Sequence, residues 1–315
     1  MFGDLDTNRD TAIRIIKQEI GMKPINVTRF TTGYCHCVYY VKTKNGEFVL
    51  RITGKDAKNY YYGSIKWLSE LDTLGIPVPK IISHGQNEDV FFALLSFIPG
   101  KDLGEIYYTL NDSQKRKIVR ELSVIQRKIA NLPTSGRYGY LHSENTDSFI
   151  TWIEYIESCI ARARKRIRKN KIFDADICDC VTAAMDNQKE YLLKVQPTPF
   201  LDDITTKNVL IHEGKLSGIV DIDEICCGDP LFVIGLTNMA LLFMQTDTKY
   251  IDYWLDEMNA DDVQRNAVVF YTLLFCVDFM GEQGMQFGND KVISYNEKTV
   301  DLLYSYYYEL LEKLI

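Results

Sequence analysis

Three side chains with oxygen donors stand in a fixed order in the segment 200–230. Four residues separate Asp203 from Asn208, and Asp221 follows Asn208 by 13 positions. Transfer of a phosphoryl group from a nucleotide needs an Asp that accepts the proton of the attacking hydroxyl. It also needs Asn and Asp oxygens that bind Mg²⁺ beside the phosphates. Asp and Asn are common in turns for other reasons, but here their order provides the inventory of a phosphoryl-transfer site.

Two short strands are expected to bring these side chains together. The runs 208–212 and 216–222 are β-prone, and Gly214 lies at the turn between them. In such a hairpin the loop before the first strand carries the first two side chains, and the end of the second strand carries Asp221. We therefore expect all three on one rim of the hairpin.

The same segment resembles a known family. It is similar to the H-x-D-x-x-x-x-N and I-D-x-x-D elements of the aminoglycoside phosphotransferase and choline kinase-like superfamily, and residues 228–230 match the G-D-P triplet that follows them. The resemblance implies a protein-kinase-like fold and the use of ATP or GTP with Mg²⁺. It makes Asp203 the catalytic base and Asn208 and Asp221 the magnesium ligands. Asp223 then lies at a nearby acidic position that supports metal or acceptor.

The first hundred residues carry shorter matches to that family, in the family's order. The run 31–34 stands where the family has its phosphate-covering turn, and Arg51 stands where a strand cation holds the nucleotide phosphates. The run 75–79 resembles the link after the first helix, and the run 95–100 resembles the hinge whose backbone meets the adenine. The nucleotide-binding residues implied by these matches are Arg51, Gly33, Ser96, Phe97 and Ile98.

The sequence departs from the family pattern at three places. Leu201 stands where the family has a His two residues before the catalytic Asp, and Gly33 is the single glycine of the phosphate turn. No Glu stands near Ser64, where the helix acid that pairs with the strand cation is expected. These departures leave open a different class of protein, a nucleotide-binding module that has lost catalysis.

The pattern of the first hundred residues is that of a small sheet with one helix. Strands are predicted over 38–41 and 48–52, with Asn45-Gly46 as a hairpin turn in which both residues have positive φ. A helix is predicted over 60–74, followed by a strand over 91–97.

Beyond Pro99-Gly100 the pattern becomes helical. Asn111-Asp112-Ser113 can cap a helix that ends near residue 131, and further helices are predicted over 151–171, 174–194 and parts of 231–315. The predicted fold class is α+β and bilobal. Its N-lobe spans 1–98 with the nucleotide-binding sheet, and its C-lobe spans 99–315 with the catalytic loop, metal site and acceptor cleft.

Composition excludes several other classes of protein. The chain has 315 residues and a formal net charge of −7, which argues against general nucleic-acid binding and permits a cationic acceptor. The basic run 162–171 is interpreted as a solvated helix face. No signal peptide and no uninterrupted apolar run of membrane-spanning length is found, so a cytoplasmic protein without a membrane partner is expected. The eight cysteines form no C-x-x-C pair and predict reduced thiols.

The expected activity is that of a small-molecule kinase. It would transfer the γ-phosphate of ATP or GTP to a hydroxyl of an antibiotic such as an aminoglycoside. A metabolic kinase for a sugar, choline or another amino alcohol is the alternative within the class, because fold does not fix substrate. Glu224, Asp278 and Glu282 are acidic residues near the expected acceptor cleft.

Overall fold

The computed structural model describes residues 9–30, 36–141, 148–287 and 291–314. The chain divides into two compact units. The first comprises the residues up to Pro99 together with the segments Ser217–Glu224 and Gln286–Val292. The second comprises Gly100–Leu216, Ile225–Met285 and the residues from Ile293 onwards. The segment that carries Asp221 and Asp223 therefore folds with the N-terminal residues, and the loop that carries Asp203 and Asn208 does not.

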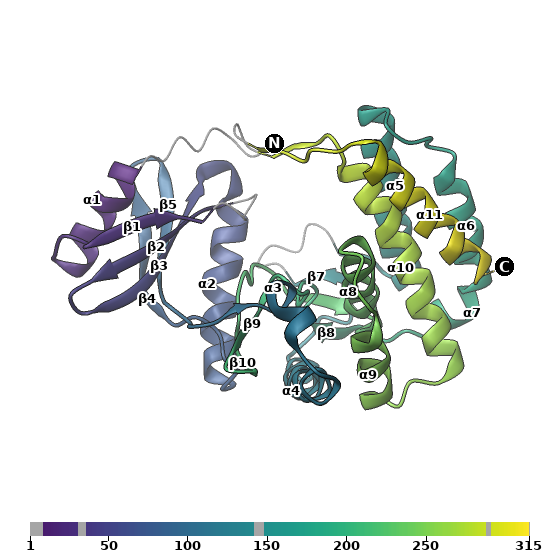
Figure 1. Ribbon diagram of the computed structural model, residues 1–315, viewed down its shortest axis with the longest axis horizontal. Helices are drawn as coiled ribbons and strands as arrows, with labels where there is room; N and C mark the ends of the chain where they lie inside the picture. The colour runs from purple at the N-terminus through teal and green to yellow at the C-terminus, as the bar shows by residue number, and fades with distance from the viewer. Residues whose placement is uncertain (1–8, 31–35, 142–147, 288–290, 315) are drawn as a thin grey trace. The chain divides into compact units, whose positions relative to one another are not determined.

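The first unit is built on a five-stranded antiparallel sheet with the order β1-β2-β3-β5-β4 (Figure 1). Two helices, α1 (Arg9–Ile20) and α2 (Lys58–Thr73), pack against it, and a single 3-10 turn (η1, Lys55–Ala57) leads into α2. The strands are β1 (Asn26–Arg29), β2 (Cys37–Thr43), β3 (Gly46–Gly54), β4 (Ile81–Asn87) and β5 (Val90–Ser96).

Strand β3 separates the apolar core of this unit from its polar face. Successive side chains of a strand point to opposite faces. Leu50 and Ile52 accordingly join the buried cluster that includes Ile15 and Ile16 of α1. Arg51, between them, points to the other face and reaches Ser64 of α2. The alternation of side chains along β3 thus places the buried Arg51 guanidinium on the side of the strand that contacts α2.

The hairpin between β2 and β3 differs from the sequence expectation in its turn. Thr43 pairs with Gly46, so the two turn residues are Lys44 and Asn45. Of the predicted pair Asn45-Gly46, only Gly46 has a positive φ, 144°. The Thr43 hydroxyl donates to the Gly46 carbonyl at 3.1 Å and accepts from the backbone N–H of Asn45 at 3.1 Å. These two hydrogen bonds stabilise this register.

The second unit is mainly helical. Its long helix α10 packs against α5, α8 and α11, and α4 packs against α9 (Figure 1). The helices are α3 (Leu103–Ile106), α4 (Asp112–Ile129), α5 (Trp152–Asn170), α6 (Ile177–Asn187), α7 (Lys189–Leu192), α8 (Leu231–Phe243), α9 (Lys249–Glu257), α10 (Asp262–Glu282) and α11 (Glu297–Glu312), with a 3-10 turn, η2, at Tyr107–Thr109.

Short strands complete the architecture. One three-stranded sheet has the order β7-β11-β8 and another β10-β9-β6, while β12 pairs with β13. The chain passes from the second unit to the first within β10. The strands are β6 (Lys101–Asp102), β7 (Gly139–Tyr140), β8 (Thr198–Phe200), β9 (Val209–His212), β10 (Lys215–Ile219), β11 (Cys226–Gly228), β12 (Gln286–Phe287) and β13 (Lys291–Val292).

Local capping explains where the long helices begin. Asn111 caps α4 and Thr151 caps α5, each through a reciprocal capping box with the residue three positions later. The predicted starts of both helices are therefore confirmed. The single helix predicted over 174–194 is wrong, because the chain breaks at Gln188 into α6 and α7.

Helix α10 is long and apolar enough to cross a membrane by length and composition alone. However, 61% of its most apolar window is buried within the structure, against α5, α8 and α11. A helix that is apolar on most of its circumference is typical of a core position, and this place in the second unit accounts for its composition.

Candidate active site

The predicted catalytic loop lies in the second unit, between β8 and β9. It begins at Leu201, whose side chain is buried. The side-chain amide of Gln126, from α4, accepts a hydrogen bond from the Leu201 N–H at 3.0 Å and donates one to the Leu201 carbonyl at 3.0 Å. A buried amide therefore holds the backbone at the position where the family has a His.

Within the loop, Asp203 and Asn208 are held together by short bonds. The Nδ2 of Asn208 donates to the Asp203 carbonyl at 2.8 Å, and the Thr205 hydroxyl donates to the Asp203 carboxylate at 3.2 Å. The Asn208 N–H donates to the Thr205 carbonyl at 3.1 Å. Because the amide nitrogen of Asn208 is committed to the backbone, its oxygen is the atom left to act as a ligand.

The two hydrogen bonds between Gln126 and Leu201 give a first testable prediction. Gln126→Leu keeps the side-chain volume but leaves the Leu201 N–H and carbonyl without their partner, and each unsatisfied buried group costs about 1–3 kcal/mol. We expect the free energy of unfolding to fall by about 2–4 kcal/mol, measured by urea denaturation.

The control for this prediction is Gln196→Leu, at an exposed side-chain amide of the same unit that donates a hydrogen bond to the nearby Lys194 carbonyl at 3.2 Å. That variant should be close to wild type. Equal stability losses in the two variants would contradict the role of Gln126.

In the first unit, Arg51 is the centre of an ionic network. Its side chain is buried on the side of β3 that contacts α2. Nη1 donates to the Ser64 hydroxyl at 2.9 Å, while Nη2 lies 3.0 Å from Asp221 Oδ1 and 2.5 Å from Asp223 Oδ1. The acidic partner that the sequence does not show on the helix is therefore provided by residues 170 or more positions away.

Asp223 is bound from two sides. Its Oδ2 lies 3.0 Å from His36 Nε2, and the other ring nitrogen of His36 lies 2.9 Å from the Thr53 hydroxyl of β3. Burial alone would raise the pKa of the Asp223 carboxyl. The Arg51 guanidinium and the His36 hydrogen bond outweigh burial and hold this pKa well below its usual range. Asp223 is thus a stable anion in the network.

Asp221 is the more accessible of the two carboxylates. Its side chain is 51% exposed, against 19% for Asp223. Its backbone has a φ of 59°, a left-handed conformation that Asp tolerates better than most residues. Asn208 and Asp221 both offer hard oxygen donors of the kind that Mg²⁺ prefers. Their chemistry fits the predicted metal, although the described residues contain no cluster of three or more His, Cys, Asp or Glu that could hold an ion alone.

The predicted adenine segment follows β5. Ser96 closes this strand: its N–H donates to the Lys80 carbonyl at 2.8 Å, and its hydroxyl accepts from the Lys80 N–H at 2.8 Å. Phe97 packs edge-on against Tyr40, and Ile98 packs against Gly218. Gly33 lies outside the described residues, so its predicted role stays a prediction.

Asp229 of the Gly-Asp-Pro triplet has a structural environment. One of its oxygens accepts from the Tyr191 and Tyr271 hydroxyls, each at 2.7 Å, and the other accepts from the N–H of Leu231, the first residue of α8, at 3.0 Å. Its carboxyl is buried, and burial raises its pKa. These contacts join α7, α8 and α10.

The acidic residues considered for an acceptor lie in different units. Glu224 belongs to the first unit, whereas Asp278 and Glu282 belong to α10 in the second. Asp278 Oδ1 lies 2.9 Å from Arg166 Nη1 and 3.5 Å from Arg162 Nε, and Glu282 lies 3.5 Å from Arg166. Two arginines of the basic run are therefore paired with α10.

Glu282 gives a pH-dependent prediction. Burial, assisted by the charge of Asp278, raises the pKa of Glu282 to about 7 from 4.5, with nearby cations opposing the shift. The folded state then binds the proton more tightly than the unfolded state, so stability falls as pH rises from about 4.5 to about 7. Because 32% of the side chain is exposed, we discount the effect for solvent screening.

We expect Glu282→Gln to be more stable than wild type by about 1–2 kcal/mol at pH 8 and equal to it near pH 4. Urea unfolding at a series of pH values measures the difference. Glu312→Gln, on α11 of the same unit, provides the control. A stability difference that does not change with pH would contradict the assignment.

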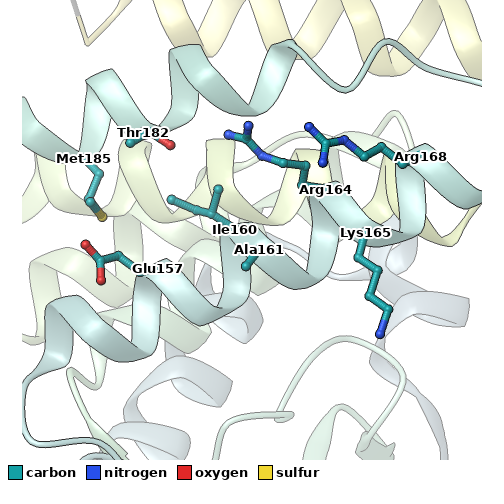
Figure 2. A pocket seen from close by; sticks show the side chains of 8 residues that line it. All are labelled: Glu157, Ile160, Ala161, Arg164, Lys165, Arg168, Thr182 and Met185. Carbon is teal, nitrogen blue, oxygen red and sulfur yellow. The ribbon is translucent and has the colours of Figure 1, made fainter.

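An open groove of about 500 Å³ lies elsewhere in the second unit, between α5 and α6 (Figure 2). Apolar side chains and the stems of basic ones line it, and none of the predicted site residues does. The lining residues are Glu157, Ile160, Ala161, Arg164, Lys165 and Arg168 of α5 with Thr182 and Met185 of α6. Arg164 is paired with Asp179 at 2.7 Å.

Comparisons with known proteins bear on the fold and the family. The model of the family described as "Phosphotransferase enzyme family" matches residues 26–258. A ternary complex of a thermostable mutant of the aminoglycoside phosphotransferase APH(4)-Ia with AMP-PNP and hygromycin B is 14% identical, with a TM-score of 0.70 over 96% of this chain and 98% of that one. The predicted fold class and the predicted family resemblance are both confirmed.

Two further proteins resemble this chain, one in structure over most of its length and one in sequence over about a third of it. The crystal structure described as a putative fructosamine-3-kinase from Haemophilus somnus 129PT is 13% identical, with a TM-score of 0.66 over 95% of this chain and 96% of that one. An uncharacterised Staphylococcus aureus protein from the ileS 3′ region is 26% identical over 113 residues, which is 36% of this chain and 79% of that protein.

Proposed function

Because the chain belongs to the phosphotransferase enzyme family, we propose that it is a small-molecule kinase. It transfers the γ-phosphate of ATP or GTP to a hydroxyl of an antibiotic such as an aminoglycoside. The observation that carries the proposal is the loop in which Asn208 is bonded to the Asp203 carbonyl at 2.8 Å. That loop combines a carboxylate with a ligand oxygen in the order that phosphoryl transfer requires.

Each residue has a distinct task in this proposal. Asp203 orients the acceptor hydroxyl and takes its proton, and the Thr205 hydroxyl fixes the Asp203 carboxylate at 3.2 Å. Asn208 and Asp221 hold Mg²⁺, which supplies charge neutralisation to the phosphates when bound. Arg51 binds phosphate oxygens through its planar guanidinium. Ser96, Phe97 and Ile98 receive the adenine, and Gly33 belongs to the turn over the phosphates.

The acceptor has two supported chemistries. The APH(4)-Ia structure contains hygromycin B, and a neighbour with a TM-score of 0.65 contains streptomycin and ATP, which supports an aminoglycoside. The neighbour described as a fructosamine-3-kinase supports the alternative of a metabolic kinase for a sugar-derived amine. Both are hydroxyl-bearing small molecules with amino groups, and the acidic chain is compatible with either.

The test is acceptor-dependent release of ADP or GDP in the presence of Mg²⁺. Aminoglycosides, fructosamines, choline and simple sugars are supplied in turn with ATP and with GTP. Release that depends on one class of acceptor would name the substrate. If no acceptor stimulates release and Mg²⁺-dependent hydrolysis in water is also lacking, the chain is a nucleotide-binding module without catalysis.

A further inference from the structure

The counter-ion of Arg51 is not on the helix where kinases of this fold place it. In protein kinases the strand cation pairs with a Glu of the following helix. Here the helix offers Ser64, whose short side chain accepts one hydrogen bond from Arg51 at 2.9 Å and carries no charge. The buried guanidinium still requires an anion, because an unpaired buried charge is costly. Asp223 and Asp221 provide the negative charge.

Close packing brings the helix and the acid together. A Cβ built on Gly63 of α2 would collide with the Asp223 carbonyl oxygen. The glycine thus lets the backbone of α2 approach the chain at residue 223, directly beside Ser64. The helix and the acidic segment both belong to the first unit.

The two carboxylates are not equivalent. Asp223 uses both oxygens within the protein, Oδ1 for Arg51 and Oδ2 for His36, and its side chain is only 19% exposed. Asp221 contacts Arg51 through its Oδ1, and its side chain is 51% exposed. A metal ligand needs an accessible oxygen, which favours Asp221 for the metal. Asp223, committed on both oxygens, is suited to hold another residue in place.

We infer that Asp223 is a positioning residue that holds Arg51 for the nucleotide phosphates, in the role that a helix acid has in protein kinases. His36 fixes the second oxygen of Asp223 and is itself fixed by Thr53 at 2.9 Å. The inference rests on the proposed function, because it assigns Arg51 to phosphate binding. It changes the role of Asp223 from support of metal or acceptor to support of the cation.

The experiment compares Asp223→Asn with Asp221→Asn, and uses Asp89→Asn as the matched control. Asp89 carries the same chemical group in the same unit but is 86% exposed and forms an ion pair with Lys55. The readout is Mg²⁺-dependent ATP hydrolysis at saturating ATP, titrated with Mg²⁺. We expect Asp223→Asn to lower kcat about tenfold or more, because a misplaced phosphate cation is costly to the rate. Its half-saturating Mg²⁺ concentration should stay near that of wild type.

A double variant tests whether Asp223 acts through Arg51. In an Arg51→Met background, Asp223→Asn should cause little further loss of kcat, since the cation that it positions is already gone. Additive losses would overturn the inference. A shift of the half-saturating Mg²⁺ concentration as large as that of Asp221→Asn would also overturn it, because Asp223 would then be a metal ligand.

A second readout needs neither metal nor nucleotide. Thermal unfolding of the same single and double variants, without Mg²⁺ or ATP, measures the coupling between Arg51 and Asp223. We expect the double variant to lose less Tm than the sum of the single variants, and full additivity would contradict the ion pair itself. If the variants show a clear coupling but the wild-type protein neither binds nor hydrolyses nucleotide, the ion pair exists and the proposed function is refuted. The role of the pair in phosphate binding is then refuted as well.

Discussion

Asp203→Ala is expected to lower acceptor-dependent turnover by ~10²–10⁴-fold, the usual contribution of a general base. The methyl side chain cannot accept the hydroxyl proton or align the acceptor. Nucleotide affinity should be nearly unchanged, since Asp203 is assigned to the acceptor and not to the phosphates. The Asn208 bond should also survive, because it goes to the backbone carbonyl of residue 203 and not to the carboxylate. Steady-state kinetics and nucleotide titration measure the two quantities.

The control for Asp203→Ala is Asp186→Ala, the same substitution at an exposed position of α6 in the same unit. It should retain wild-type turnover. Full activity in Asp203→Ala would remove the base from the proposal. A parallel loss of nucleotide affinity would show instead that the variant disturbs the loop, and Tm would then separate misfolding from a direct contact with nucleotide.

Local sequence signals predicted the elements that carry strong periodicity or caps. The helices α4 and α5 follow from the capping residues Asn111 and Thr151 and from their apolar stripes. The β9–β10 hairpin and the order of Asp203, Asn208 and Asp221 could likewise be read from short runs. These features depend on neighbours within a few positions, which is the range over which a pattern in a single sequence is informative.

Other elements carried little local signal. Strand β4 spans a run with Ser, His, Gly, Gln and Asn, and it forms because β5 beside it offers a continuous partner. In this strand tertiary packing and not local propensity decides the structure. Helix α1 differs, because Ala12, Ile15 and Ile16 have helical spacing and are buried in the core cluster of the first unit, yet no helix was predicted there.

The network around Arg51 could be predicted only in part. Arg51 and Asp221 were identified by position, but the missing helix acid left the cation without a partner. The actual partners lie 170 positions away or more, and no single-sequence pattern records a contact of that length. One feature of the sequence could have predicted the hydrogen bonds from Gln126 to Leu201. Gln126 is a polar residue on the apolar face of α4, between Ile125 and Ile129.

Asp221→Asn is expected to weaken Mg²⁺-dependent nucleotide binding by about tenfold or more, which corresponds to about 1.4 kcal/mol. The amide keeps the size of the side chain but removes the negative charge that a hard cation favours. Asn also tolerates the left-handed backbone at this position, where φ is 59°, whereas Ala would add backbone strain. The substitution therefore tests the ligand and not the fold.

The decisive comparison for Asp221→Asn is titration with ATP in the presence of Mg²⁺ and again in the presence of a chelator. Without the metal, loss of a carboxylate should not weaken binding of the polyanion, because one repulsive charge has been removed. Arg51 keeps its pairing with Asp223 in this variant, so the phosphate cation stays in place. A loss of affinity that is equal with and without Mg²⁺ would assign Asp221 to the support of Arg51 and leave Asn208 without its partner ligand.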